Sequence, residues 1–274
     1  KEEEKTAGLN ATVLAYDGIA VIVNPENPVS VGEVKGRIVF ENVWFAYQGE
    51  DWILKDVSFT IGEGEMVGYI GPNGAGKSST IKILSGILTP DSGTVLVDGR
   101  VPYKDRIDHV RQIGVVFGQR SQLWWDVPVI DSFELLKDIY SISNSTYNNN
   151  LEELTELLEL KELLRSPARQ LSLGQRMRCE IAASLLHSPK ILFLDEPTLG
   201  LDVIARSELW DLIRTLKGKV TIILTTHYME EAEALSDRIG IMKDGKLLVV
   251  GTAEELMKMA FAERFEDAFV RIVK

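Results

Sequence analysis

The segment GPNGAGKS at residues 71–78 decides the fold, because it matches the pattern G-x-x-x-x-G-K-[ST] in full. A short apolar run, Met66–Ile70, precedes it and a helical pattern, Lys77–Gly86, follows it. In such a loop the glycines let backbone amides approach phosphate oxygens, and the start of the helix attracts the anion. The segment therefore predicts a nucleotide site, and the residues expected to bind it are Gly71, Asn73, Gly74, Ala75, Gly76, Lys77, Ser78 and Ser79.

Two of these residues carry specific chemistry. The ammonium group of Lys77 places a positive charge where the β- and γ-phosphates lie, and the hydroxyl of Ser78 is a ligand for Mg²⁺. Further along, the apolar strand Ile191–Leu194 ends in Asp195 and Glu196. Ligands of parallel sheets gather at the carboxyl ends of strands, so both carboxylates are expected to face the phosphates. We expect Asp195 to lie in the outer shell of Mg²⁺, and Glu196 to orient and deprotonate an attacking water.

The pattern around the loop predicts an α/β fold. Short apolar, β-branched runs alternate with helical segments from residue 36 to residue 251, which is typical of a mainly parallel sheet flanked by helices. Residues 129–165 are mostly helical in pattern, with a polar break at 141–150. Thr252 and Glu255 match a helix-capping box and predict a helical C-terminal tail.

Composition excludes several classes of protein. Hydrophobic residues make up 45% and charged residues 26% of the 274 residues, as in an ordinary globular protein. The single cysteine excludes an internal disulfide and a zinc site built from several cysteines. No apolar run approaches the roughly 18 residues that cross a bilayer. The net charge of −11 disfavours binding to duplex nucleic acid, so we expect no nucleic-acid partner.

A second segment, Leu171-Ser172-Leu173-Gly174-Gln175, opens a helix that runs to His187. Ser172 and Gln175 form the pattern of a capping box, and the simplest interpretation is a helix start. A Ser-x-Gly start is also suited to bind an anion. One chain supplies no obvious second phosphate for it.

Together these motifs resemble the nucleotide-binding domain of ATP-binding-cassette (ABC) transporters, over about residues 37–250. The phosphate loop, the Leu-Ser-Leu-Gly-Gln signature, the Asp195-Glu196 strand and His227 occur in that family's order and spacing. The resemblance implies a P-loop NTPase fold with an antiparallel β subdomain and an inserted α-helical subdomain. Residues 66–250 are most similar to the stand-alone ATPase subunits of bacterial exporters.

The resemblance also implies roles for single residues. Tyr47 is similar to the aromatic residue that stacks on adenine, with a core strand aromatic as the alternative. Gln119 is similar to the glutamine that contacts Mg²⁺ and water, with Gln122 as a competitor. Asp202 lies in a loop that crosses the family's dimer, and His227 is similar to the histidine that contacts the γ-phosphate. Ser172, Leu173, Gly174 and Gln175 would face the ATP of an opposite subunit, although Leu173 stands where glycine is commoner.

The function implied is ATP hydrolysis that drives transport, with ATP and Mg²⁺ as cofactors. The implied partners are a second copy, bound head to tail, and integral membrane subunits. The implied location is cytoplasmic, at the inner face of the cell membrane. Trp124-Trp125-Asp126 is expected to face the membrane subunits, with core packing as the alternative. Two other functions remain open at this point: a soluble ABC-type ATPase outside transport, and a nucleotide-binding scaffold without coupled turnover.

The N-terminal region follows a different pattern. Thr12–Tyr16 and Ile19–Val23 flank Asp17-Gly18 and predict a β-hairpin, followed by a linker at 24–28. The interruption at Asp17 argues against a secretory signal. Residues 16–28 weakly resemble a segment of periplasmic phosphate-binding proteins, whereas residues 36–61 resemble the single-chain exporter branch. This mixture leads to the hypothesis of a recombined or engineered N-terminus.

The length allows one large domain with an appendage, or two domains. We expect an appendage at residues 1–35, an ATPase domain at 36–251 with a helical subdomain at about 119–187, and a helical tail at 252–274.

Overall fold

The computed structural model describes residues 37–118 and 120–274. The β-hairpin expected near Asp17-Gly18 and the expected role of Gln119 lie outside these residues. The chain divides into two units, 1–35 and 36–274, and the description that follows concerns the second.

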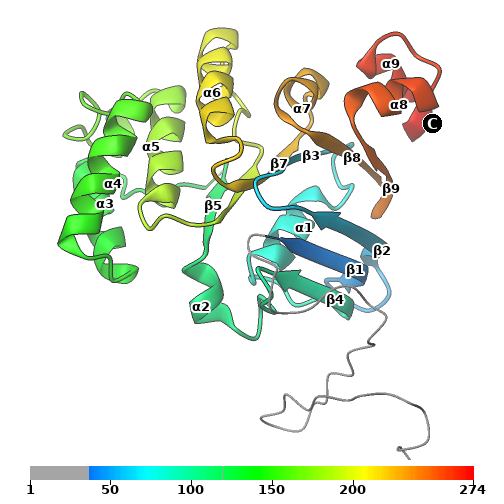
Figure 1. The fold of residues 1–274 in the computed structure, drawn as a ribbon, viewed down its shortest axis with the longest axis horizontal. Coiled ribbons are helices and arrows are strands. Elements are labelled where there is room, and N and C mark those ends of the chain that lie inside the picture. The colour runs from blue at the N-terminus through cyan, green and yellow to red at the C-terminus, as the bar shows by residue number, and fades with distance from the viewer. Residues whose placement is uncertain (1–36, 119) are drawn as a thin grey trace, which may run out of the picture. The chain divides into compact units, whose positions relative to one another are not determined.

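A six-stranded sheet forms the centre of this unit, in the order β5-β6-β7-β3-β8-β9 (Figure 1). Its first five strands are parallel and β9 is antiparallel to β8. The sequence therefore predicted the α/β class and the mainly parallel sheet correctly. The strands are β3 (Met66–Ile70), β5 (Ile113–Phe117), β6 (Ile191–Asp195), β7 (Thr221–Thr226), β8 (Arg238–Lys243) and β9 (Lys246–Gly251).

Both faces of the central strands β3, β6 and β7 are buried, and alternate residues of each strand point to opposite faces. In β6, Leu192 and Leu194 belong to a core shared with helices between residues 129 and 216, whereas Ile191 and Phe193 belong to a second core. This second core includes residues of α1 (Lys77–Leu84) and of an antiparallel sheet in the order β2-β1-β4. The strands of that sheet are β1 (Ile38–Ala46), β2 (Trp52–Ile61) and β4 (Ser92–Val97). Because both faces are covered, the strands read as continuous apolar runs in the sequence.

The helices between β5 and β6 form a helical region on one side of the sheet (Figure 1). It contains α3 (Val129–Ile139), α4 (Asn144–Leu157), the 3₁₀ turn η2 (Ala168–Gln170) and α5 (Leu173–Leu185). The polar break expected at 141–150 is shorter than predicted. The hydroxyl of Ser143 accepts a hydrogen bond from the amide of Thr146 and starts α4 within that polar stretch. A helix cap therefore compensates for the weak helix propensity of this segment.

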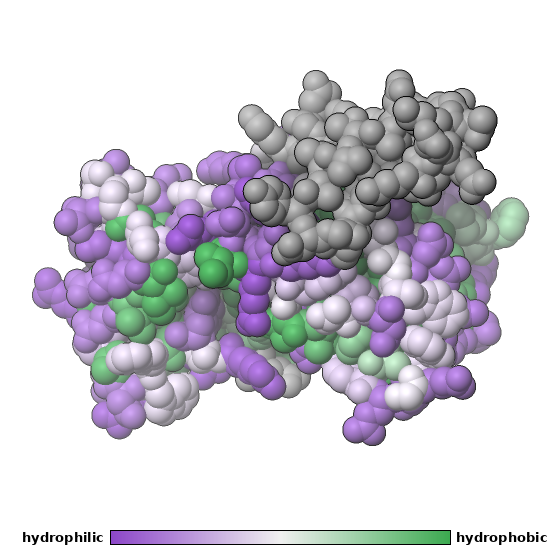
Figure 2. Space-filling model, turned by 90° about the horizontal axis from the view of Figure 1, so that it is seen from below, coloured by the Kyte–Doolittle hydropathy of each residue, from purple (hydrophilic) through white to green (hydrophobic). Residues whose placement is uncertain are grey.

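The remaining helices are α2 (Arg106–Val110), α6 (Val203–Leu216), α7 (Met229–Leu235), α8 (Ala253–Met259) and α9 (Phe265–Val273). The capping box expected at Thr252 and Glu255 is present and starts α8. In the part of the chain that the structure describes, no helix is both long and apolar enough to span a membrane. The surface in Figure 2 is largely hydrophilic, with smaller hydrophobic areas between.

Candidate nucleotide site

The phosphate loop lies between β3 and α1, at the edge of the sheet where the parallel strands have their carboxyl ends. Its last glycine, Gly76, is the N-cap of α1 and has a φ of 101°, a value that L side chains rarely adopt. A Cβ at this position would also lie 2.5 Å from Cδ2 of Leu54. No side chain caps α1. The first amides of this helix therefore remain free to bind an anion.

Lys77 begins α1 and is 5% exposed. Its Nζ donates hydrogen bonds to the carbonyl oxygens of Gly71 at 2.7 Å and of Pro72 at 3.2 Å. Burial lowers the pKa of Lys77, and the nearby carboxylates of Glu196 and Asp195 oppose this effect. The ammonium group is thus held at the loop by backbone carbonyls.

Asp195 joins three elements at the end of β6. One carboxylate oxygen, Oδ1, accepts hydrogen bonds from the hydroxyl of Ser78 at 2.9 Å and from that of Thr225 at 2.5 Å. Thr225 lies directly across from Asp195 in the parallel pairing of β6 with β7. The strand order β6-β7-β3 therefore brings the acidic strand end and the phosphate loop to one edge of the sheet.

Glu196 follows Asp195 in the left-handed backbone region, with a φ of 52°. Its amide donates to the backbone carbonyl of Thr225 at 3.0 Å, and Gly118 packs so closely that a Cβ there would lie 2.2 Å from the carbonyl oxygen of Glu196. Held in this way, the Glu196 carboxylate lies 3.8 Å from Nδ1 of His227. An unusual backbone conformation maintained by its neighbours is common at functional sites.

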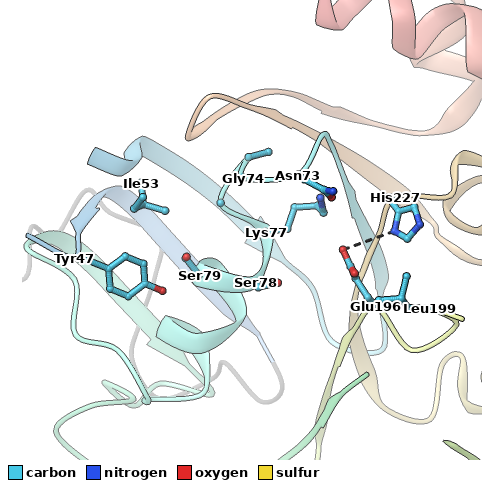
Figure 3. Close-up of a pocket in the computed structure, with 12 residues that line it drawn as sticks. Tyr47, Ile53, Asn73, Gly74, Lys77, Ser78, Ser79, Glu196, Leu199 and His227 are labelled. Atoms are coloured by element: carbon cyan, nitrogen blue, oxygen red, sulfur yellow. Dashed lines mark ion pairs between the residues drawn. The ribbon is translucent and has the colours of Figure 1, made fainter. Parts of the chain in front are cut away.

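Lys77, Glu196 and His227 line a cavity of about 550 Å³ (Figure 3), whereas Asp195 lines a neighbouring pocket together with Ser78 and Glu196. Tyr47 lies at one end of the group of residues and the Glu196–His227 pair at the other, with the phosphate loop between them. The lining residues are Tyr47, Ile53, Asn73, Gly74, Ala75, Gly76, Lys77, Ser78, Ser79, Glu196, Leu199 and His227. Most residues expected to bind nucleotide are therefore brought together in one place.

Tyr47 follows β1 and is 56% exposed, so the alternative of a core aromatic is wrong. Its ring contacts Phe45 edge to face, with ring centroids 5.0 Å apart. Tyr47 is thus exposed at the cavity that the phosphate loop also lines.

The signature segment does not contribute to this lining. Ser172 is exposed and caps α5, where its hydroxyl accepts from the Gln175 amide at 3.2 Å and the Gln175 side chain accepts from the Ser172 amide at 2.9 Å. The predicted capping box is therefore present. Leu173 packs against the core, and its Cδ2 would meet a Cβ at Gly200 at 3.2 Å. This inward packing explains how leucine is accommodated next to Gly174.

Asp202 lies outside the cavity lining as well. It is the N-cap of α6, and its Oδ1 accepts a hydrogen bond from the amide of Ala205 at 2.9 Å. Val203 and Ile204 follow it and are 79% and 73% exposed. The loop thus presents a capped turn and two apolar side chains at the surface.

Sequence reasoning missed Thr225, which holds both Asp195 and the Glu196 amide. The sequence does show Thr225 as a polar residue near the end of a mostly apolar strand. Its contact with Asp195, however, depends on the pairing of β6 with β7, which the sequence does not give. Ile53 and Leu199 were also missed as lining residues. Apolar residues of this kind carry no signal that separates a pocket wall from a core.

The fold and site together define a nucleotide-binding protein with a phosphate loop between a strand and a helix. A model of the ABC transporter family matches residues 54–199 of the chain. The chain belongs to this family and contains its ATP-binding ATPase domain, as the sequence predicted.

Similar proteins agree with this assignment. The chain is 36% identical over 245 residues to the probable multidrug ABC transporter ATP-binding protein YbhF of Escherichia coli strain K12, over 87% of this chain and 42% of that protein. It is 36% identical over 219 residues to the daunorubicin resistance ATP-binding protein DrrA3 of Streptomyces coeruleorubidus, over 80% of this chain and 69% of that protein. The chain thus spans less than half the length of YbhF.

A solved structure shares the fold at a TM-score of 0.69. It is the ATP-binding cassette MJ0796, described as a dimer in a post-hydrolysis state bound to ADP and Pi. The two sequences are 29% identical, over 78% of this chain and 98% of that one.

Proposed function

We propose that this chain binds and hydrolyses ATP as the nucleotide-binding subunit of a transporter, and that hydrolysis drives transport through separate membrane subunits. The observation that carries the proposal is the convergence of Lys77, Ser78, Glu196 and His227 on one cavity. A lysine at the phosphates, a hydroxyl that can bind Mg²⁺ and a carboxylate that can orient or deprotonate water are groups that recur at sites of phosphoryl transfer.

In this proposal the base of ATP stacks on Tyr47 and the phosphates lie along the loop. The free amides at the start of α1 and the Nζ of Lys77 bind the β- and γ-phosphates. Lys77 must exchange its bonds to the Gly71 and Pro72 carbonyls for bonds to phosphate oxygens. Because the lysine already lies at the loop, this exchange needs only a rotation of the side chain.

The residues present fit Mg²⁺. Ser78 Oγ and Asp195 Oδ1 are 2.9 Å apart, and both are hard oxygen donors beside the phosphate loop. No group of three or more metal-binding side chains exists among the described residues. Mg²⁺ in nucleotide sites relies on one or two protein oxygens, water and phosphates, so two donors suffice. We propose that Ser78 binds the ion directly and that Asp195 lies in its outer shell. Gln119 is proposed to contact the ion as well. Bound there, the ion would neutralise charge on the phosphates.

We propose that Glu196 takes a proton from the attacking water and that His227 contacts the γ-phosphate. The 3.8 Å separation of these two side chains allows both to reach one water or phosphate oxygen. Thr225 supports the arrangement by holding the amide of Glu196 at 3.2 Å with its hydroxyl.

The exposed signature segment supports pairing of two copies head to tail, with Ser172 and Gly174 on the ATP of the opposite copy. MJ0796, the related cassette, was solved as a dimer. Asp202 and the exposed Val203 and Ile204 are proposed to lie in the same interface.

We further propose that membrane subunits bind near Trp124 and Trp125, which are 56% and 52% exposed. The alternative of core packing for these two residues is therefore wrong. A pocket of about 300 Å³ is lined by Ser121 and Gln122 of the same loop and in part by Ile87, Phe117 and Tyr140. Such a subunit would place this chain at the inner face of the cell membrane. Co-purification with an integral membrane protein, lost on Trp124→Ala, would support this site.

Glu196→Gln tests the proposed hydrolysis. The amide cannot accept the proton of water, so turnover at saturating ATP should fall by about 10²–10⁴-fold while ATP binding is retained. Phosphate release and equilibrium binding measure the two effects. Glu63→Gln is the matched control, because Glu63 is exposed and lines a different pocket, with Lys190 and Gly218; it should keep native turnover.

Native turnover in Glu196→Gln would exclude Glu196 as the base. A native chain that binds ATP but never hydrolyses it, even at concentrations where copies pair, would favour a nucleotide-binding scaffold.

A further inference from the structure

Glu231 is a buried acid that the proposed reaction does not use. It lies in α7 and its exposed fraction is 0%. Its Oε2 accepts a hydrogen bond from the hydroxyl of Thr198 and its Oε1 accepts one from the indole nitrogen of Trp210, both at 3.0 Å. The hydroxyl of Thr226 donates to it as well. One carboxylate therefore joins four separate segments of the chain.

Two of these segments carry the proposed catalytic pair. Thr198 follows Glu196 by two residues, and Thr226 directly precedes His227. Both threonines are 1% exposed, so their bonds to the Glu231 carboxylate are shielded from water. Fixing these two points fixes the positions from which the Glu196 and His227 side chains project.

The third segment, α6, anchors the arrangement. Trp210 lies in α6, and Arg206 of the same helix stacks on the ring of Tyr228 with its guanidinium carbon 4.0 Å from the centroid. Burial raises the pKa of Glu231, and the bonds from the two threonines and Trp210, with the charge of Arg206, oppose this effect. Loss of one of these hydrogen bonds would leave the buried Glu231 carboxylate without one of its donors and destabilise the fold. The cluster therefore favours a single arrangement of the four segments.

We propose that Glu231 is a positioning residue that holds Glu196 and His227 in register for hydrolysis. It does so by binding Thr198 on the segment after Glu196 and Thr226 on the segment before His227. The inference rests on the proposed roles of Glu196 and His227 in hydrolysis. Misplacing a reacting group by about 1 Å can cost 10²-fold in rate, so a hydrogen bond at this distance from the chemistry affects turnover.

Thr198→Val tests the inference, because valine keeps the volume and removes only the hydroxyl. We expect kcat for ATP to fall by about tenfold and KM to stay within about twofold, since Lys77 and Tyr47 are untouched. The matched control is Thr221→Val, which likewise removes the hydrogen-bonded hydroxyl of a buried threonine. Thr221 is also 1% exposed and its hydroxyl accepts from the Gly64 amide at 2.9 Å, but it lies at the opposite end of β7. This variant should lose comparable thermal stability and keep native kcat.

An equal fall of kcat in both variants would overturn the inference, because it would mean general loosening of the fold. Native kcat in Thr198→Val, together with an inactive Glu196→Gln, would overturn it while leaving the proposed function intact. Native turnover in Glu196→Gln would instead count against the proposed function itself, whatever Thr198→Val does.

Discussion

The chain has two helix N-termini that are suited to bind phosphate, at α1 and α5, and they differ in whether a side chain caps them. At α1 no side chain caps the helix, and Lys77 and the Ser78–Asp195 pair are assembled around the free amides. At α5 the Ser172 hydroxyl already accepts from the Gln175 amide, the Gln175 side chain accepts from the Ser172 amide, and Ser172 is exposed. Among the described residues, the first start therefore lines the cavity together with Glu196 and His227, whereas the second does not line it.

This difference supports the proposed pairing of two copies. The capping box already occupies the amides of Ser172 and Gln175, so α5 has fewer free amides for an anion than α1. We infer that α1 determines ATP affinity in a single copy, whereas α5 acts only when a second copy brings its ATP. Changes at the two starts should therefore separate binding from turnover.

Among changes at the two helix starts, the largest effect is expected for Gly174→Asp. A carboxylate at the exposed helix start repels the phosphates of the opposite copy, so turnover should fall by about 100-fold or more. ATP binding to a single copy should be unchanged, because the signature segment does not line the cavity. Gly174→Ala is the control: it introduces the same Cβ, 3.0 Å from that of Ala205, without the charge. Phosphate release and ATP titration measure the two quantities.

Mixing two inactive variants sharpens the same prediction. In a head-to-tail pair of Gly174→Asp with Glu196→Gln, one of the two sites combines an intact phosphate loop, Glu196 and an intact signature. An equimolar mixture should therefore recover about a quarter of native turnover, if copies pair at random. No recovery on mixing would contradict the head-to-tail arrangement.

The same contrast shows what could be predicted from sequence. The loop at 71–78 and the Asp195-Glu196 strand end were predicted because each is local: a few adjacent residue types specify both structure and chemistry. The capping boxes at Ser172 and Thr252 were predicted for the same reason. Functions that depend on adjacent residues can therefore be predicted from the sequence.

Thr225 and Glu231 were not predicted, because their roles depend on strand order and helix packing. Thr225 contacts Asp195, 30 residues away, only because β6 pairs with β7. Glu231 lies in a helix of acidic pattern, where a solvent-facing residue is the usual expectation. The start of α4 in a polar stretch was missed because a single cap outweighed local propensity.

An intermediate effect is expected for Tyr47→Ala, on the α1 side of the comparison. Loss of a stacking surface costs roughly 1–3 kcal/mol per base, so the Kd of ATP should rise by about tenfold. Tyr47→Phe should bind like the native chain, because the ring and not the hydroxyl contacts the base. Turnover at saturating ATP should be native in both variants. A fall of kcat with unchanged ATP affinity would place Tyr47 outside the base site.

The smallest effect concerns two histidines that anchor helices α1 and α5. Nε2 of His109 bonds to the carbonyl of Leu84 at the end of α1 at 2.8 Å, and Nε2 of His187, just beyond α5, bonds to that of Ile113 at 2.9 Å. Burial lowers the pKa of both imidazoles. Each bond requires the neutral ring to carry its proton on Nε2.

Because the folded pKa is lowered, the folded chain resists protonation, whereas the unfolded chain takes up a proton below a pH of about 6.5. The free energy of unfolding should therefore fall as the pH drops through 6.5 toward the folded pKa. His109→Gln can still donate to the Leu84 carbonyl but does not titrate, so its loss of stability between pH 7.5 and pH 5.5 should be smaller than the native loss. Denaturant unfolding at the two pH values measures this difference. His187→Gln should show the same reduced slope, together with a loss at every pH, because the ring of His187 stacks on Tyr140 at 4.0 Å. An unchanged slope in His109→Gln would show that this histidine is not what makes the α1 side sensitive to acid.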